Sequence, residues 1–151
     1  MSDLAAWAPF IPIVWIVGWI TASVFYRRSA GKPIWARLPE QARFKERGAS
    51  GWGDNSLFGR MGGARNCLMV AVTDQEIVVT PFFPFTLLFM PEMFGLEMRA
   101  PLSQVRRIER RSRFLRDAVI VELWDGQRIG LYLFKPDTFE AALRMGGART
   151  I

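Results

Sequence analysis

An uncharged segment near the N-terminus, residues 4–26, constrains this chain more than any other feature. Most of its residues are apolar, and as a helix it would be about 34 Å long, enough to cross the hydrocarbon core of a membrane. Trp7 and Tyr26 lie near its two ends, where aromatic side chains favour the lipid headgroups. We therefore expect one transmembrane helix over residues 4–26, in an integral, single-pass membrane protein.

A cleaved secretory signal is the alternative for this segment. It fits less well, because no basic residue precedes the segment and the apolar run is longer than the core of such a signal. Basic residues follow the segment before the first acid, Glu40, whereas only Asp3 precedes it. The positive-inside rule then predicts a protein of the inner membrane, with its N-terminus outside and residues 27–151 in the cytoplasm.

Two small residues within the segment, Gly18 and Ala22, are the candidate helix–helix contact. They are four positions apart, as in the small-xxx-small pairs that let a second helix approach closely. Small residues are also common in such helices without any contact, so both interpretations stay open.

Residues 27–55 are expected to connect the helix to a domain. Gly31 and Pro33 interrupt any continuation of the first helix. Residues 39–47 could form a short juxtamembrane helix. The basic residues of this connector, interleaved with Trp35, either lie along an anionic membrane surface or only fix the topology.

Composition excludes several classes of protein. Apolar residues make up 50% of the chain and charged residues 23%, which is unlike a disordered sequence. The chain has no histidine and one cysteine, Cys67, so the commonest general base, the commonest metal ligand and a cysteine-rich zinc site are missing. The nearest acidic cluster, Asp117, Glu122 and Asp125, is explained by strand alternation and a turn. We expect no enzyme activity, no cofactor and no metal site.

Residues 56–146 are expected to form one mainly β domain, followed by a tail, residues 147–151. Apolar and β-branched runs predict strands, and the segments concerned are 67–72, 77–79, 102–110, 119–124 and 128–134. Asp125-Gly126 predicts a tight hairpin between the last two. A helix is expected to begin at Asp137 or Thr138, to end near Met145 and to pack over the sheet.

The order of these features resembles the pleckstrin-homology (PH) superfamily, in particular its GRAM-like and bacterial PH-like branches. The similar runs are Asn66–Val79, Ala100–Glu109, the Asp125-Gly126 hairpin and Phe139–Leu143, within residues 56–146. The resemblance implies a split barrel of about seven antiparallel strands capped by a C-terminal helix, and a role in binding or scaffolding. The expected fold is therefore a single transmembrane helix followed by a PH-like β domain.

This chain departs from phosphoinositide-binding PH domains at its first hairpin loop. Those domains usually carry basic residues in and around that loop. Here the loop, Thr73-Asp74-Gln75, is short and acidic, so no lipid-phosphate ligands are assigned to it.

An aromatic segment, residues 81–94, is the first candidate contact surface. Its prolines and its short uncharged length argue against a second membrane span. Some of its rings belong in the core of a small barrel, and the others would form an exposed apolar patch for a partner or a membrane. The candidate contact residues are Phe82, Phe83, Phe85, Leu87, Leu88 and Phe89.

An arginine-rich segment, residues 106–116, is the second candidate surface. Arg106 and Arg110 are expected to share the outward face of a strand, with Arg113 and Arg116 in or near the following loop. These four arginines would contact an anionic surface, or they form an ordinary solvated charge run. Nucleic acid is an unlikely partner, because no recognition helix, ribonucleoprotein motif or zinc finger accompanies them.

The expected function is that of a non-enzymatic, membrane-anchored PH-like module that binds a protein partner. It would serve as an accessory or assembly subunit of an inner-membrane complex. The alternative is a peripheral sensor domain that binds anionic lipids, with acidic phospholipids as its partners.

Overall fold

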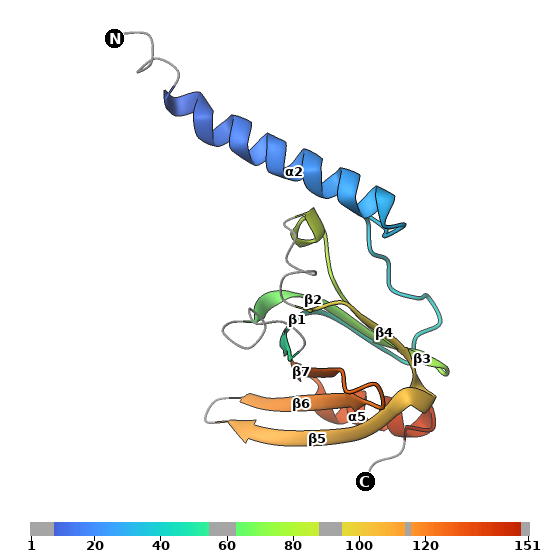
Figure 1. Cartoon of the computed structure of the whole chain (residues 1–151). Coiled ribbons are helices and arrows are strands. Elements are labelled where there is room, and N and C mark those ends of the chain that lie inside the picture. Colours follow the sequence, from blue (N-terminus) through green and yellow to red (C-terminus); the bar gives the residue numbers. More distant parts are fainter. Residues whose placement is uncertain (1–7, 55–62, 88–94, 114–115, 149–151) are drawn as a thin grey trace.

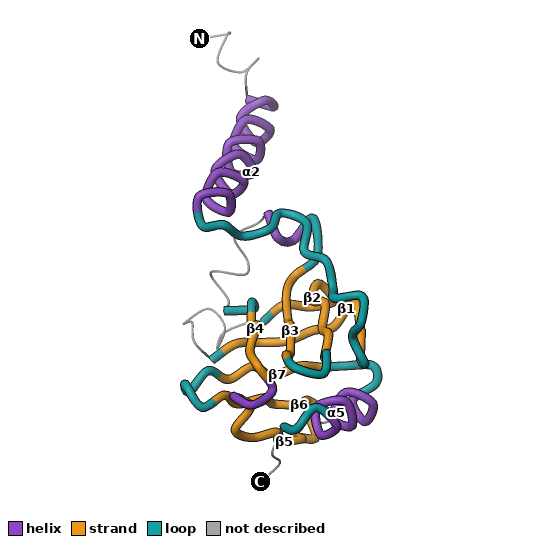
Figure 2. Tube along the Cα trace, turned by 90° about the vertical axis from the view of Figure 1, so that its right-hand side faces the viewer, coloured by secondary structure: helices purple, strands orange, loops and turns teal. Residues whose placement is uncertain are grey.

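The computed structural model describes residues 8–54, 63–87, 95–113 and 116–148 of the 151-residue chain. A single 3-10 turn, η1 (Ala8–Phe10), precedes a long helix, α2 (Ile11–Ser29). The helix projects from a mainly β domain, to which a connector without regular structure joins it (Figures 1 and 2).

The described part of the domain holds a seven-stranded antiparallel sheet and a C-terminal helix, α5 (Pro136–Met145). Its strands are β1 (Phe44–Gly53), β2 (Ala64–Val72), β3 (Glu76–Pro81), β4 (Met98–Pro101), β5 (Val105–Arg113), β6 (Arg116–Leu123) and β7 (Arg128–Tyr132). Two further 3-10 turns, η2 (Phe85–Leu87) and η3 (Leu102–Gln104), flank β4.

The strand order is β4-β3-β2-β1-β7-β6-β5, and β1 joins the two halves of the sheet (Figure 1). Residues 44–51 of β1 pair with β2, and residues 50–53 pair with β7. The register shifts on both sides of Ala49, next to Gly48, whose φ of 87° suits glycine. These irregularities bend β1, so that one strand can serve both halves.

The core is one cluster of buried apolar side chains from both halves of the sheet and from α5. Helix α5 contributes Phe139, Ala142 and Leu143, which recur at the spacing of one helix face. Phe139 packs edge-on against Phe44 of β1, with ring centroids 5.3 Å apart. The predicted position of the C-terminal helix against the sheet is therefore confirmed.

The predicted hairpin at Asp125-Gly126 is also confirmed. Gly126 has a φ of 87°, and the backbone N–H of Gln127 donates to the Asp125 carboxylate at 2.8 Å. A second turn forms at residues 73–75, where the Thr73 hydroxyl accepts from the backbone N–H of Glu76. Local sequence determines both turns because the side chain that shapes each one lies within the turn itself.

The prediction of a transmembrane helix over residues 4–26 is wrong. Among the described residues, no helix is both long and apolar enough to cross a membrane. Helix α2 has Pro12 in its first turn, and Arg27 and Arg28 occupy its last turn. Its uncharged part, residues 11–26, is therefore only about 24 Å long, against roughly 30 Å for a hydrocarbon core. The described residues therefore do not support the expected transmembrane anchor.

Two local predictions also fail. The short helix expected at residues 39–47 is absent, because Phe44–Gly53 forms β1 and pairs with strands from two other parts of the chain. The predicted strand at residues 102–110 begins only at Val105, after η3. No local pattern predicts β4, a strand of four residues.

Candidate functional site

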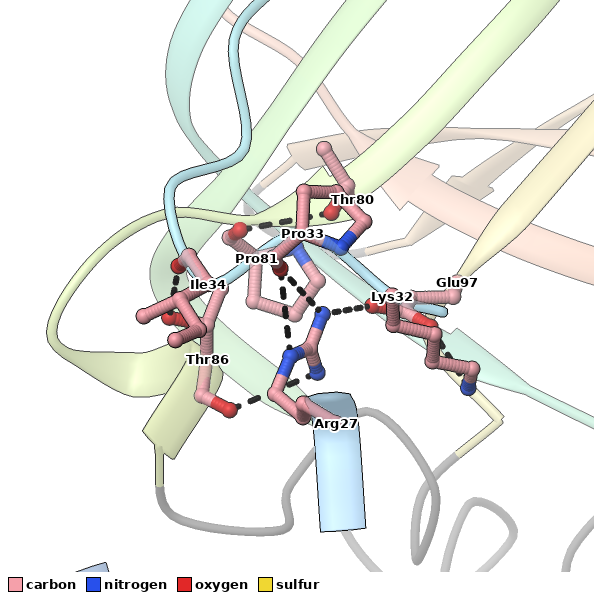
Figure 3. A network of polar contacts seen from close by, with 8 residues as sticks. All are labelled: Arg27, Lys32, Pro33, Ile34, Thr80, Pro81, Thr86 and Glu97. Atoms are coloured by element: carbon pink, nitrogen blue, oxygen red, sulfur yellow. Dashed lines mark hydrogen bonds and ion pairs between the residues drawn. The ribbon is translucent and has the colours of Figure 1, made fainter. Parts of the chain in front are cut away.

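The candidate functional site lies where the last turn of α2 meets the domain. Arg27 is central to it, because its side chain is only 1% exposed although it carries a charge. Four elements meet around its guanidinium, namely α2, the connector, η2 and the residue that precedes β4 (Figure 3). We call this set of contacts the junction.

The guanidinium of Arg27 donates in three directions. Nε and Nη2 donate to the carbonyl of Pro33 at 3.2 and 3.1 Å, which holds the connector against the helix. Nη1 donates to the carbonyl of Thr86 at 3.4 Å, and Nη2 also donates to Oε1 of Glu97 at 2.7 Å. The fork of an arginine suits such a site because its donors diverge in one plane.

Glu97 also accepts from Lys32, whose Nζ lies 2.9 Å from Oε2. Burial alone would raise the pKa of Glu97, but the hydrogen bonds from Arg27 and Lys32 outweigh burial and lower it. Two cations therefore hold one ionised carboxylate. This arrangement ties the end of α2 and the start of the connector to the residue next to β4.

Thr86 completes the junction from η2. It is fully buried, and its hydroxyl donates to the carbonyl of Ile34 at 3.1 Å. Nearby, the rings of Trp35 and Phe83 stack with centroids 4.2 Å apart. The connector is thus held by polar contacts and by one aromatic contact.

Of the four predicted apolar contact residues that the structure describes, three are partly buried by this chain's own packing. Phe82 and Phe85 pack against the core and meet edge to face at 5.3 Å, and the Arg47 guanidinium lies over the Phe82 ring. Leu87 is half-buried, and Phe83 remains 37% exposed beside Trp35. Leu88 and Phe89 lie outside the described residues.

The arginines of the segment 106–116 do not share one surface. A register shift between Val105 and Arg107 puts Arg106 and Arg110 on opposite faces of the sheet, so the predicted shared face is wrong. Arg106 lies 3.5 Å from a Glu122 oxygen and over the Trp124 ring. Arg113 and Arg116 pair at the ends of β5 and β6, and their side chains lie outside the described part of the structure.

Arg110 is surrounded by acids. It donates to Asp117 at 2.8 Å and to Asp137 at 2.5 Å, and a Glu140 oxygen lies 3.9 Å away. Hydrogen bonds with Asp137 and Asp117 raise the pKa of Arg110 further above its ordinary value. These carboxylates already neutralise the positive charge of Arg110, which a lipid phosphate would otherwise bind. The lipid-binding expectation is therefore unsupported.

A shallow apolar groove of about 560 Å³ runs along α2. Its lining residues are Phe10, Ile11, Val14, Trp15, Gly18, Trp19 and Ala22, so it includes the predicted pair of small residues. Gly18 and Arg27 are separated by about two and a half helical turns, which places them on opposite sides of α2. The groove therefore faces away from the junction.

The acidic residues that the sequence singled out are occupied structurally. Asp117 pairs with Arg110, Glu122 lies beside Arg106 and Arg128, and Asp125 shapes its turn. Within the described ranges, no group of three or more His, Cys, Asp or Glu residues could hold a metal ion. Cys67 is buried, which raises the pKa of its thiol.

Sequence reasoning missed the junction. It interpreted Arg27 and Lys32 as bases that set a topology, and it gave Glu97 and Thr86 no role. Arg27 and Glu97 are 70 positions apart, so no local pattern joins them. The one sequence feature that points to the junction is Glu97, an acidic residue that follows a long aromatic segment. No protein-family model matches this chain, and no curated protein matches its sequence.

Proposed function

We propose that this chain is a non-enzymatic binding module whose β domain holds α2 as an arm for attachment to a partner protein. The observation that carries the proposal is that α2 is held at one end and exposes an apolar groove along its length. The held end is the buried junction at Arg27.

The exposed apolar surface of α2 is large for a single helix. Val14 is 70% exposed and Trp15 is 67% exposed, and further large apolar side chains lie along the same helix. Contiguous apolar surfaces of this kind mark sites of interaction. Aromatic residues such as Trp15 are common at the centres of protein interfaces, where they contribute much of the binding free energy.

The junction supports the same role because it fixes the direction of the arm. Arg27 makes its contacts with three other elements, so rotation of α2 would break several hydrogen bonds together. A helix that is held before binding loses less conformational freedom when its partner arrives. The β domain thus fixes the orientation of the binding surface on α2.

The architecture of the β domain supports the PH-like scaffold as part of this proposal. Its seven antiparallel strands and its C-terminal helix are consistent with that resemblance. A scaffold of this type is expected to bind rather than to catalyse, in agreement with the use of α2 proposed above.

The test uses a photoreactive amino acid at Trp15 of the full chain, produced in the cells that naturally contain it. A matched control carries the same amino acid at Trp124, which is 62% exposed on the β domain. We expect a discrete protein adduct from position 15 and none of the same mass from position 124. Val14→Asp should reduce the adduct at position 15, since a charge in the groove opposes apolar packing.

Equal, diffuse labelling from both positions would contradict the proposal. So would a discrete adduct at position 15 that Val14→Asp leaves unchanged. In either case the apolar face of α2 would not be a specific protein-binding surface.

A further inference from the structure

Large and small residues together line the groove on α2. Trp15, Gly18 and Ala22 follow the alternating spacing of three and four that forms a packing seam between helices. Trp19 stacks on Trp15, with ring centroids 5.3 Å apart, and stands beside the gap above Gly18. A side chain added at Gly18 would meet nothing within 4 Å, so the described part of the chain leaves this gap open.

We propose that the groove is filled by a second copy of the same helix, packed antiparallel and crossing near Gly18. This inference rests on the proposed binding role of α2 and names its partner. The result is a two-fold dimer in which the same face of each α2 contacts the other.

Size complementarity favours the antiparallel direction. When two copies cross between positions 18 and 19, Trp19 of one copy faces Gly18 of the other, and Trp15 faces Ala22. Each of the two tryptophans then meets a small residue. In a parallel pair, Trp15 would face Trp15 and Gly18 would face Gly18, which leaves the rings crowded and the glycines apart.

Charge favours the same direction. Each chain carries a net charge of +6, and Arg28 is exposed at the end of α2 that joins the domain. A parallel pair would bring both domains and both Arg28 side chains to one end. An antiparallel pair places them at opposite ends, which lowers the repulsion between like charges.

The available area is sufficient for a small specific interface. The five large groove residues, Phe10, Ile11, Val14, Trp15 and Trp19, are between 40% and 70% exposed. Since a buried aromatic side chain covers roughly 150–250 Å², these residues together offer on the order of 500 Å² per copy. Two copies would bury about 1,000 Å², the lower limit for specific association.

Disulfide cross-linking tests the arrangement in the full chain. The native Cys67 is buried, so the wild-type chain should form no disulfide-linked dimer and serves as the negative control. Under a mild oxidant, Gly18→Cys should form a covalent dimer, because the two positions lie at the crossing. Ala22→Cys should form at least tenfold less covalent dimer. The two copies of position 22 would be about 10 Å apart along the axis, and a disulfide spans a Cα separation of at most about 7 Å.

Ile13→Cys is the matched control, because Ile13 is 57% exposed on the other side of the helix. It should not form a dimer. A size measurement on uncross-linked protein supplies the second readout: wild type should have twice the mass of one chain, and Gly18→Leu should be a monomer. The open space at Gly18 means that this change should leave the melting temperature of the domain unaltered.

Strong dimers from both Gly18→Cys and Ala22→Cys would show a parallel pair and overturn the inference. A monomeric wild-type chain would also overturn it. If the photoreactive group at position 15 then captured a different protein, the proposed binding function would stand while its identification with a second copy would fall. If that group captured nothing discrete, both proposals would fail.

Discussion

Arg27 and Arg110 differ both in their polar partners and in their exposure. Arg110 lies among three carboxylates, whereas Arg27 has Glu97 and two backbone carbonyls. Arg110 is 37% exposed, so water can replace its carboxylate partners. Arg27 is 1% exposed, so water cannot replace the partners of its guanidinium. The number of carboxylates therefore says little about importance, and burial decides which arginine the structure depends on.

The largest expected effect comes from Arg27→Ala. The hydrogen bonds of the buried guanidinium involve a charged donor and contribute about 1.5–3 kcal/mol each, and their loss leaves Glu97 with Lys32 as its partner. The backbone amides of Ala30, Gly31 and Lys32, which bond to carbonyls in the last turn of α2, should then exchange with solvent roughly a hundredfold faster or more. Arg28→Ala, a change at the exposed neighbouring position, should leave their exchange rates unaltered. Equal exchange in both variants would show that Arg27 does not hold the junction.

The second-largest effect is expected from acid, which should weaken the contacts of Glu97 in the junction. The pKa of Glu97 is lowered in the folded chain, so its ionised form stabilises the junction above the unfolded pKa of about 4.3. That stabilisation is lost as the pH falls through the lower, folded value. We expect exchange at Lys32 to accelerate below about pH 4.3, relative to core amides such as that of Val121, after correction for intrinsic rates. In Glu97→Gln the ratio should not depend on pH, and a wild-type ratio without pH dependence would contradict the account.

Thr86→Val should have a moderate effect. The change keeps the shape of the buried side chain and removes the hydroxyl that donates to Ile34. The carbonyl of Ile34 then loses a partner, at a cost of about 1 kcal/mol. Thr80→Val is the matched control, because the Thr80 hydroxyl makes only a 3.3 Å contact with the adjacent Pro81 carbonyl and is not fully buried. If thermal unfolding showed Thr80→Val to be as costly as Thr86→Val, the junction would have no special role for this hydroxyl.

Arg110→Gln should have the smallest effect on stability. Its ion pairs are exposed, so solvent and salt screen them. The melting temperature should fall less than in Thr86→Val, and the difference from wild type should shrink as salt is added. A loss as large as that of Arg27→Ala would mean that exposure does not distinguish the two arginines.

The sequence predicts those parts of the fold that depend on near neighbours. Asp125 and Gly126 define their own turn, and the β-branched run at residues 119–121 identifies β6. In contrast, β1 contains Gly48, Gly51 and Gly53, which disfavour a strand locally, and it exists because β2 and β7 pair with it. Its formation is a tertiary effect that no local pattern contains.

The candidate site was harder to predict for the same reason. Gly18 and Ala22 were found from their spacing, because both lie on one helix. The junction depends on contacts between Arg27, Thr86 and Glu97, which the chain brings together only when the sheet has formed. The aromatic segment is unusual in composition, but the sequence cannot show that Trp35 of the connector stacks on Phe83.

The distance between α2 and the β domain tests the central claim most directly. Spin labels at Ile13→Cys and Trp124→Cys occupy exposed positions, and the buried Cys67 should remain unlabelled. With labelled chains diluted in unlabelled ones, pulsed electron spin resonance should give one narrow distance distribution, which Arg27→Ala broadens and Arg28→Ala does not. A broad distribution in the otherwise wild-type chain, or one that Arg27→Ala leaves unchanged, would contradict the claim that the junction holds α2 as a fixed arm.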